Sequence, residues 1–152
     1  MTGADILALT LRAEAGSKPV RAIEALAALA VNRARLAAAD ATAAARYAPG
    51  AAPGLGLAPM LALVCRAPFL FGCWMPKHPR RKALLNAMLS GEADAALETC
   101  RRVAARAAAG VLGDPTGGAT HWHLAEELPG WAVGLVPTAE IGGFIFYRLP
   151  AG

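Results

Sequence analysis

The sequence has few carboxylates and few aromatic side chains, and it lacks a long uninterrupted hydrophobic run. Only 11 of the 152 residues are aspartate or glutamate, and aromatic residues make up 6% of the chain. The longest apolar stretch, residues 22–31, contains Glu24 and is followed by Asn32 and Arg33. A membrane-spanning helix needs about 20 apolar residues, so we expect no integral membrane contact. The first residues also lack the basic segment of a signal peptide, and we expect synthesis in the cytoplasm without one.

Composition and charge indicate a folded chain without a nucleic-acid partner. Hydrophobic residues make up 56% of the sequence and charged residues 17%, which excludes a disordered chain and predicts a single domain over residues 1–152. The net charge of +4 favours approach to polyanions. The densest basic groups, at residues 80–82 and 101–106, have helical spacing and no nucleic-acid motif beside them. We therefore interpret them as solvated helix faces.

Three cysteines, Cys65, Cys73 and Cys100, leave at least one thiol unpaired in a monomer. Their spacing matches no zinc module, and the sequence predicts neither a metal nor another cofactor. Cys65 and Cys73 bracket a short segment that a disulfide would close in an oxidising compartment. Two reduced, packed thiols fit the same spacing equally well, so both alternatives stay open.

Helical periodicity dominates the first two thirds of the chain. Thr2 and Asp5 have the spacing of a capping box, and apolar residues then recur at three- and four-residue steps until Gly16. A second helical stretch, either continuous or divided in two, is predicted from Pro19 to about residue 45. The proline and glycine pairs between residues 47 and 59 predict a loop. Further helices are predicted at residues 60–66, 81–89 and 93–109, with Gly91 between the last two.

The last third of the chain adds β structure. Residues 114–118 form a turn cluster, residues 121–123 alternate polar and aromatic side chains, and residues 144–147 have the pattern of a strand. Gly142 and Gly143 allow either a hairpin corner or a close approach of the backbone to a ligand. The predicted fold class is therefore α+β, a mainly helical single domain with a small β hairpin or sheet in the C-terminal third.

One carboxylate, Glu14, lies where a helix end would change its chemistry. It falls on the largely apolar face that carries Leu7 and Leu11, just before the stop signal at Gly16 and Ser17. The negative end of the helix dipole and apolar surroundings both favour a protonated side chain, as a general acid requires. The alternative is a solvated helix-end acid with no chemical role, and spacing alone favours that alternative.

Four blocks of sequence, followed by two shorter ones, resemble a single protein family. The four blocks are Glu14-Ala15-Gly16 with Pro19; Val31-Asn32-Arg33; residues 65–74, Cys-Arg-Ala-Pro-Phe-Leu-Phe-Gly-Cys-Trp; and residues 114–123, Asp-Pro-Thr-Gly-Gly-Ala-Thr-His-Trp-His. Ile141-Gly142-Gly143 and Phe146-Tyr147-Arg148 close the set. In this order and spacing, the blocks resemble the SleB/CwlJ-type cell-wall hydrolases, which include spore-cortex lytic enzymes.

The resemblance implies a lysozyme-like domain that acts on the glycan strands of peptidoglycan, with Glu14 as the catalytic acid. Such an acid protonates the glycosidic oxygen between N-acetylmuramic acid and N-acetylglucosamine. A hydrolase normally uses a second carboxylate, whereas a lytic transglycosylase uses the C6 hydroxyl of the muramic acid, so one acid that then acts as base suffices. Asp114 is the best second acid, but its place before Pro-Thr-Gly-Gly fits a turn residue better. The sequence therefore favours a lytic transglycosylase over a muramidase-type glycosidase.

The matched positions also suggest a sugar-binding groove. Its predicted substrate-binding residues are Asn32, Phe71, Trp74, Thr120, His121, His123 and Tyr147. Phe71 and Trp74 fit a buried core better than a platform for sugar rings, and Asn32 also fits a structural role near a helix end. His121 and His123 share one face of an extended segment, but the sequence offers no third ligand for a metal. We therefore interpret the two histidines as polar groove residues.

Several positions depart from the family's pattern. Lys18 stands where a second glutamate is common, Leu70 and Gly72 replace a glutamine and a serine, and Phe144 replaces a histidine. Lys18, if close to Glu14, would favour the ionised carboxylate and oppose acid catalysis. The alternative function is a catalytically weakened member that binds glycan or serves as a structural component of a phage-like particle or a wall-associated assembly. An active enzyme is expected to reach the periplasm or cell wall as an endolysin does, by holin-dependent release, or by particle delivery.

Overall fold

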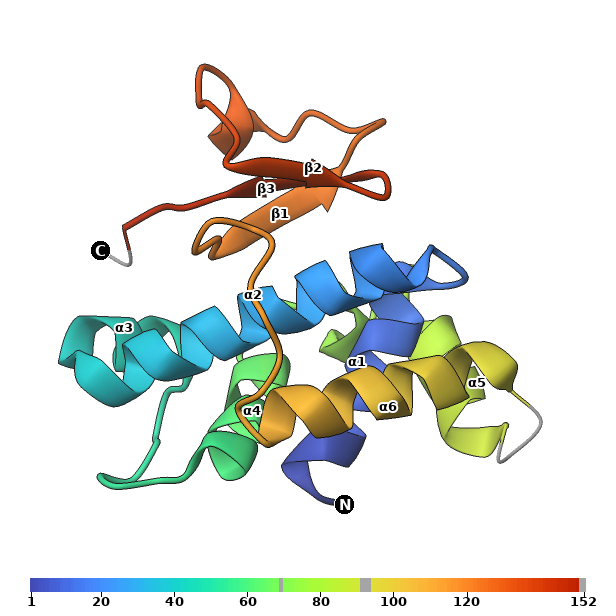
Figure 1. Cartoon of the computed structure of the whole chain (residues 1–152), viewed down its shortest axis with the longest axis horizontal. Helices are drawn as coiled ribbons and strands as arrows, with labels where there is room; N and C mark the ends of the chain where they lie inside the picture. The colour runs from blue at the N-terminus through green and yellow to red at the C-terminus, as the bar shows by residue number, and fades with distance from the viewer. Residues whose placement is uncertain (69, 91–93, 151–152) are drawn as a thin grey trace.

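A layer of helices with a small sheet on one side is formed by residues 1–68, 70–90 and 94–150, which the computed structural model describes (Figure 1). The helices are α1 (Gly3–Ala15), α2 (Val20–Ala39), α3 (Ala41–Tyr47), α4 (Leu57–Arg66), η1 (Gly72–Trp74), α5 (Arg81–Leu89), α6 (Ala95–Ala108) and η3 (Gly130–Ala132), where η marks a 3₁₀ helix. The strands are β1 (His121–Leu124), β2 (Ala139–Ile141) and β3 (Phe144–Tyr147). The predicted α+β class, mainly helical with a small sheet in the C-terminal third, is confirmed.

Helix α1 begins at the predicted capping box and runs through the middle of the helical layer. Thr2 Oγ1 accepts a hydrogen bond from the Asp5 backbone N–H at 3.1 Å, and the Asp5 carboxylate accepts one from the Thr2 backbone N–H at 2.8 Å. Helices α2, α4, α5 and α6 all contact α1, so Leu7 and Leu11 are fully buried. Each contributes roughly 2 kcal/mol by the apolar area it removes from water. Because α1 ends at Ala15, Glu14 is fixed in its last turn, inside the protein.

The predicted long helical stretch divides at Asp40. The Asp40 backbone N–H closes α2, and its side chain accepts a hydrogen bond from the Ala43 N–H at 2.9 Å to begin α3. Helix α4 begins at Leu57, earlier than the predicted residue 60, because Pro59 falls in its first turn, where no backbone N–H is required. Within the described ranges, no helix combines the length and hydrophobicity that a membrane crossing requires.

The bounds of α5 match the predicted helix at residues 81–89, and α6 begins at Ala95 after its N-cap Asp94. The Asp94 side chain accepts a hydrogen bond from the Leu97 N–H at 3.0 Å, which places the start of α6 beyond the predicted residue 93. Gly91 and Ala93, which the sequence places at this boundary, lie outside the described residues, as does Phe69 of the third family block.

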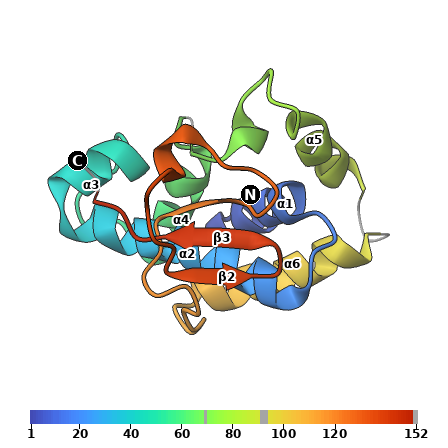
Figure 2. The ribbon, with the colours of Figure 1, turned by 90° about the horizontal axis from the view of Figure 1, so that it is seen from above.

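Strand β3 is central in the antiparallel sheet, whose order is β1-β3-β2. Gly142 and Gly143 form the turn between β2 and β3 with φ of 59° and 91°, as a two-residue hairpin turn requires. A Cβ on Gly142 would lie 2.5 Å from the Cβ of Ala22, so the missing side chain lets the hairpin corner rest on α2. The sheet therefore lies over α2, as the view from above shows (Figure 2), and the hairpin-corner alternative accounts for both glycines.

Candidate active site

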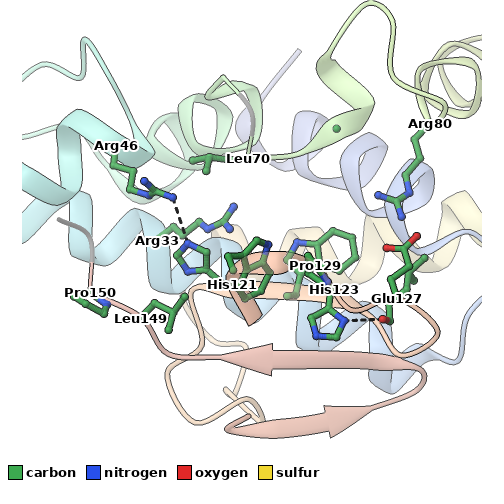
Figure 3. A pocket seen from close by; sticks show the side chains of 14 residues that line it. Arg33, Arg46, Leu70, Arg80, His121, His123, Glu127, Pro129, Leu149 and Pro150 are labelled. Carbon is green, nitrogen blue, oxygen red and sulfur yellow. Dashed lines mark hydrogen bonds between the residues drawn. The ribbon is translucent and has the colours of Figure 1, made fainter. Parts of the chain in front are cut away.

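A cleft of about 510 Å³ lies between strand β1 and the helical segments that face it. Its cationic side chains divide between two ends (Figure 3). Arg33 of α2 and Arg46 of α3 lie at one end beside His121, whereas Arg80 and Glu127 lie at the other. The walls of the cleft are thus formed by segments that are far apart in the sequence.

Glu14 lies directly behind the wall of this cleft. Its side chain has 0% solvent exposure, and Oε1 accepts a hydrogen bond from the Cys73 backbone N–H at 3.0 Å. Oε2 lies 2.9 Å from Nη1 of Arg80. This contact is an ion pair without an aligned hydrogen bond, since no donor among the described residues points at Oε2. Gly72 and Arg80 line the cleft. Residues 72–80, which supply both contacts to the Glu14 carboxylate, therefore lie between Glu14 and the cleft.

The cation beside Glu14 is Arg80, and Lys18 makes its contacts elsewhere. Lys18 Nζ donates to the carbonyl of Gly142 at 3.3 Å and lies 5.0 Å from the centroid of the Phe144 ring. The Arg80 guanidinium and the Cys73 N–H each contact one oxygen of the Glu14 carboxylate. Arg80 is distant from Glu14 in the sequence, so the residues around Glu14, from which a protonated side chain was expected, do not indicate this cation.

Strand β1 and the loop after it form an aromatic wall with polar edges. His123 Nδ1 donates to the Leu124 carbonyl at 2.7 Å, and its Nε2 is hydrogen-bonded with the Tyr147 hydroxyl at 2.9 Å. The Tyr147 ring stacks on His123 with centroids 5.4 Å apart. Trp131, whose exposed fraction is 42%, contacts His121, His123 and Tyr147 edge-on at centroid distances of 5.6, 5.8 and 5.2 Å. An exposed indole in a cleft wall offers an apolar surface for a ligand.

His121 is neutral at pH 7. Burial lowers its pKa to about 4, and the nearby charges of Arg33 and Arg46 act in the same direction. Arg46 Nη2 lies 3.5 Å from Nε2 of the imidazole, and because arginine can only donate, Nε2 carries the lone pair. The ring proton is therefore on Nδ1, which faces Thr120 Oγ1 at 2.8 Å.

Arg33 is a buried cation at the floor of the cleft, with an exposed fraction of 2%. Its Nε donates to the Thr120 carbonyl at 2.7 Å, and its guanidinium lies over the rings of Phe71 and Tyr47 at 5.2 and 5.5 Å from their centroids. Burial lowers the pKa of Arg33 to about 10, which leaves it charged at neutral pH. The sequence-predicted Phe71 and Thr120 are both buried, and they support the cleft by holding Arg33.

Asn32 and Trp74 do not line the cleft, and their side chains form hydrogen bonds with other residues of the chain. Asn32 Nδ2 donates to Asp114 Oδ2 at 3.1 Å and to the Ala119 carbonyl at 3.0 Å. Trp74 Nε1 donates to Thr10 Oγ1 at 2.9 Å. These contacts fit the structural alternatives that the sequence left open for both residues.

Asp114 is a turn residue. Its carboxylate accepts hydrogen bonds from the Thr116 N–H at 2.8 Å, the Thr116 hydroxyl at 2.6 Å and the Gly118 N–H at 2.8 Å. Burial acts to raise the pKa of Asp114, but the hydrogen bonds from Thr116, Asn32 and Gly118 outweigh it and hold the pKa below its ordinary value. A carboxylate engaged in this way is poorly placed to act as a second catalytic acid.

Comparison with solved structures establishes the fold. The chain is similar to the catalytic domain of the germination-specific lytic transglycosylase SleB from Bacillus anthracis, with a TM-score of 0.61 and 18% identity over 96% of this chain and 93% of that one. It is equally similar to the catalytic domain of the Bacillus cereus SleB protein, with a TM-score of 0.60 and 18% identity over 96% of this chain and 89% of that one. The chain has the fold of the SleB catalytic domain. The resemblance seen in the sequence blocks is therefore confirmed at the level of the fold. No protein-family model and no curated protein matches the sequence.

The residues that differ from the SleB/CwlJ pattern lie at different places in this fold. Leu70 and Gly72 line the cleft, so they change its wall directly. A Cβ on Gly72 would lie 2.4 Å from Nε2 of His78, which means that the His78 ring occupies the space a serine side chain would need. Phe144 is fully buried in the hydrophobic core and lies outside the cleft wall.

All three cysteines are free, buried thiols in this SleB-like fold. Of the two alternatives that the sequence left open, a disulfide or two reduced and packed thiols, Cys65 and Cys73 thus fit the second. Burial raises the pKa of Cys65 to about 12, and burial together with the charge of Glu14 raises the pKa of Cys73. Neither thiol is a nucleophile at neutral pH. Within the described part of the chain, no three His, Cys, Asp or Glu side chains are grouped to hold a metal ion.

Proposed function

We propose that this chain cleaves the glycan strands of peptidoglycan between N-acetylmuramic acid and N-acetylglucosamine as a lytic transglycosylase, with Glu14 as general acid and base. The position of Glu14 carries the proposal. It is a buried carboxylate at the end of α1, immediately behind a cleft with polar and aromatic walls, in the fold of a known lytic transglycosylase domain. This activity places the protein's site of action in the periplasm or cell wall.

The reaction needs a single proton carrier. Protonated Glu14 gives its proton to the glycosidic oxygen as the C1–O bond breaks and positive charge develops on the muramic acid ring. The resulting carboxylate then takes the proton of the C6 hydroxyl, whose oxygen bonds to C1 and closes a 1,6-anhydro ring. Water is not consumed, and Glu14 returns to its protonated state.

Arg80 sets a condition on this chemistry, because a paired carboxylate cannot donate a proton. The Arg80 side chain lines the cleft and is 27% exposed, so a strand that enters the cleft contacts Arg80 before it reaches Glu14. We infer that the bound strand moves Arg80 away from Glu14. Removal of the cation from a fully buried carboxylate favours its protonated form, which couples binding of the strand to formation of the acid.

In this proposal, the positions of the carboxylates near the cleft favour transglycosylation over hydrolysis. Asp114 is held in its own turn, and Glu127 is the only carboxylate in the cleft wall among the described residues. Glu127 is exposed and lies at the end of the cleft that carries Arg80. A hydrolytic mechanism would draw on Glu127 to activate water, whereas the anhydro-forming reaction has no need of it.

The proposal is tested by incubating purified sacculi with the wild-type protein, with Glu14→Gln and with Glu24→Gln. Glu24 is a matched control, because it is also paired with an arginine at 2.9 Å but lies outside the cleft. We expect release of soluble muropeptides by the wild type and Glu24→Gln, and loss of release in Glu14→Gln. Mass analysis is expected to show 1,6-anhydromuramic acid ends. Equal release by wild type and Glu14→Gln would contradict the role of Glu14, and reducing ends would contradict transglycosylation.

One observation favours a second candidate function, a glycan-binding or structural component with weakened catalysis. The Glu14 side chain has no exposed surface and is covered by Arg80, and Leu70 and Gly72 stand where two polar side chains are common in the family. If this function holds, the wild type sediments with sacculi but releases nothing from them. A phage-like particle or a wall-associated assembly is the setting in which such a component would act.

A further inference from the structure

The end of the cleft away from Glu14 has no part in the proton transfer, yet it holds two cations without anionic partners. Arg33 and Arg46 line this end together with His121 (Figure 3). Within the described residues, the arginines that pair with carboxylates are Arg12, Arg80, Arg101, Arg102 and Arg106. Neither Arg33 nor Arg46 is among them, and the carboxylate in the cleft wall, Glu127, lies at the opposite end.

Arg33 is the more informative of the two, because it is buried and incompletely bonded. Its Nε is satisfied by the Thr120 carbonyl, but Nη1 has no hydrogen-bond partner within the described residues. Buried guanidinium N–H groups are nearly always paired, because an unpaired one loses the hydration it had in water. An unpaired N–H on a residue that lines a cleft is therefore a donor available to a ligand.

Arg46 adds a second donor at the same end. Among the described residues, its only hydrogen bond is the 3.5 Å contact from Nη2 to His121, which leaves the rest of its exposed guanidinium available. His121 is neutral, so it does not compensate either charge. An anion held by two arginines is typically a carboxylate or a phosphate, since both offer pairs of oxygens that match the fork of the guanidinium.

We propose that this end of the cleft binds a carboxylate carried by the glycan strand. The inference rests on the proposed function, and it names a feature of the substrate that proton transfer does not require. Every N-acetylmuramic acid carries a lactyl group, which is either a free carboxylate or is linked to a peptide stem that bears carboxylates. Contact with Arg33 and Arg46 fixes a strand by its acidic substituent, and neutral strands without such groups bind more weakly.

The test measures binding of soluble glycan strands to the Glu14→Gln protein, in which turnover does not disturb the titration. Three strands are compared: strands with native stems, the same strands with every carboxylate converted to a methylamide, and strands freed of their stems by an amidase, which retain the lactyl carboxylate. We expect conversion to methylamides to raise the Kd about tenfold or more, because it removes a charge-assisted contact. Retained affinity of the amidase-treated strands identifies the lactyl carboxylate, and lost affinity identifies the stem.

Arg46→Gln, added to Glu14→Gln, removes one donor without disturbing the core, because Arg46 is exposed. We expect it to weaken binding of the native strands and to abolish most of the difference between native and methylamide strands. Arg35→Gln is the matched control, since it removes the same charge from an exposed position on α2 and leaves the cleft lining intact. It is expected to keep the full difference. The proposal is overturned if native and methylamide strands bind alike, or if Arg46→Gln keeps the full difference between them.

This readout separates the subsite from the proposed reaction. If the wild type cleaves sacculi but binding does not depend on the carboxylate, only the subsite is wrong. If binding depends on the carboxylate and on Arg46 while the wild type cleaves nothing, the subsite stands and the transglycosylase function is wrong.

Discussion

Nη1 of Arg80 lies 2.9 Å from Oε2 of Glu14, and the arginine rather than the carboxylate faces the cleft. The guanidinium also lies over the ring of Trp122, 5.6 Å from its centroid, which fixes it between β1 and the end of α1. Arg80 thus connects the two halves of the site, the helical layer that carries Glu14 and the sheet that carries the aromatic wall. Its removal should therefore lower the stability of the fold.

We expect Arg80→Met to lower the free energy of unfolding at pH 7 by about 1–3 kcal/mol, because it leaves a fully buried carboxylate without its cation. Urea unfolding of the wild type and the variant at pH 7 measures this change.

Arg106→Met is the matched control for this variant. Arg106 pairs with Glu24 at the same 2.9 Å, but its side chain is 50% exposed and that of Glu24 is 30% exposed. The loss of stability should be below about 1 kcal/mol, because solvent screens an exposed pair. A stability loss in Arg80→Met no larger than in Arg106→Met would show that the Glu14–Arg80 pair is not buried in solution.

Local features of the fold could be predicted from the sequence, whereas the cation beside Glu14 could not. The capping box at Thr2 determines backbone geometry over a few residues, so the sequence alone was sufficient for it. The glycine pair at 142 and 143 indicated a special backbone conformation, but the sequence left a hairpin corner and a close approach to a ligand both open. The Glu14–Arg80 pair depends on how the segment after η1 folds back onto the end of α1. Nothing in the spacing around Arg80 indicates that contact, and the basic residues at 80–82 were interpreted as a solvated helix face.

The Glu127→Gln variant tests whether the protein uses hydrolysis or transglycosylation. If the C6 hydroxyl is the nucleophile, the variant should still release muropeptides with 1,6-anhydro ends. If Glu127 activates water, its loss should slow release by about a hundredfold or more. The measurement is the initial rate of release from sacculi together with the mass of the ends. Glu126→Gln is the adjacent control, since Glu126 is exposed and does not line the cleft.

His121 should make stability depend on pH over a defined window. Its pKa in the folded protein is about 4, below the ordinary value of about 6.5, so the unfolded chain takes up the proton first as the pH falls. The contribution of His121 is therefore complete above about pH 6.5 and is lost as the pH falls to about 4. The expected loss of unfolding free energy across this window is about 2–3 kcal/mol.

His121→Gln isolates this contribution, because glutamine does not titrate. Urea unfolding at several pH values should show a smaller loss in the variant than in the wild type between pH 6.5 and 4. The hydrogen-bonded carboxylates Asp94 and Asp114 have lowered pKa values, so their own contributions are lost below this window and are shared by both proteins. Parallel pH dependence of the two proteins would mean that His121 is not held neutral by the fold.

The predicted groove residues divide according to whether a residue contacts the cleft or supports it. His121 and His123 could be placed because two residues on one extended strand share a face. Asn32 belongs to the same family blocks, yet its amide is bonded to Asp114 and Ala119. A match to a family sequence block does not show whether a residue contacts a ligand or makes a buried structural hydrogen bond. Both roles restrict which amino acid can occupy the position. Trp131 was missed because it lies in the three-residue helix η3, which is too short to show periodicity in the sequence, although an aromatic residue between proline, glycine and apolar neighbours was a usable signal.

We expect Trp131→Ala to weaken binding of glycan strands by about five- to tenfold, because it removes an exposed apolar surface of the cleft wall on which a sugar ring can stack. The free energy of unfolding should change by less than about 1 kcal/mol, since the side chain is 42% exposed. Titration of soluble strands into Glu14→Gln with and without Trp131→Ala measures the change. Val133→Ala, at a 64% exposed position just after η3 and outside the cleft lining, should bind like the parent. Equal affinity of the Trp131 and Val133 variants would remove the indole from the binding surface and leave the histidine edges of β1 as its sugar contacts.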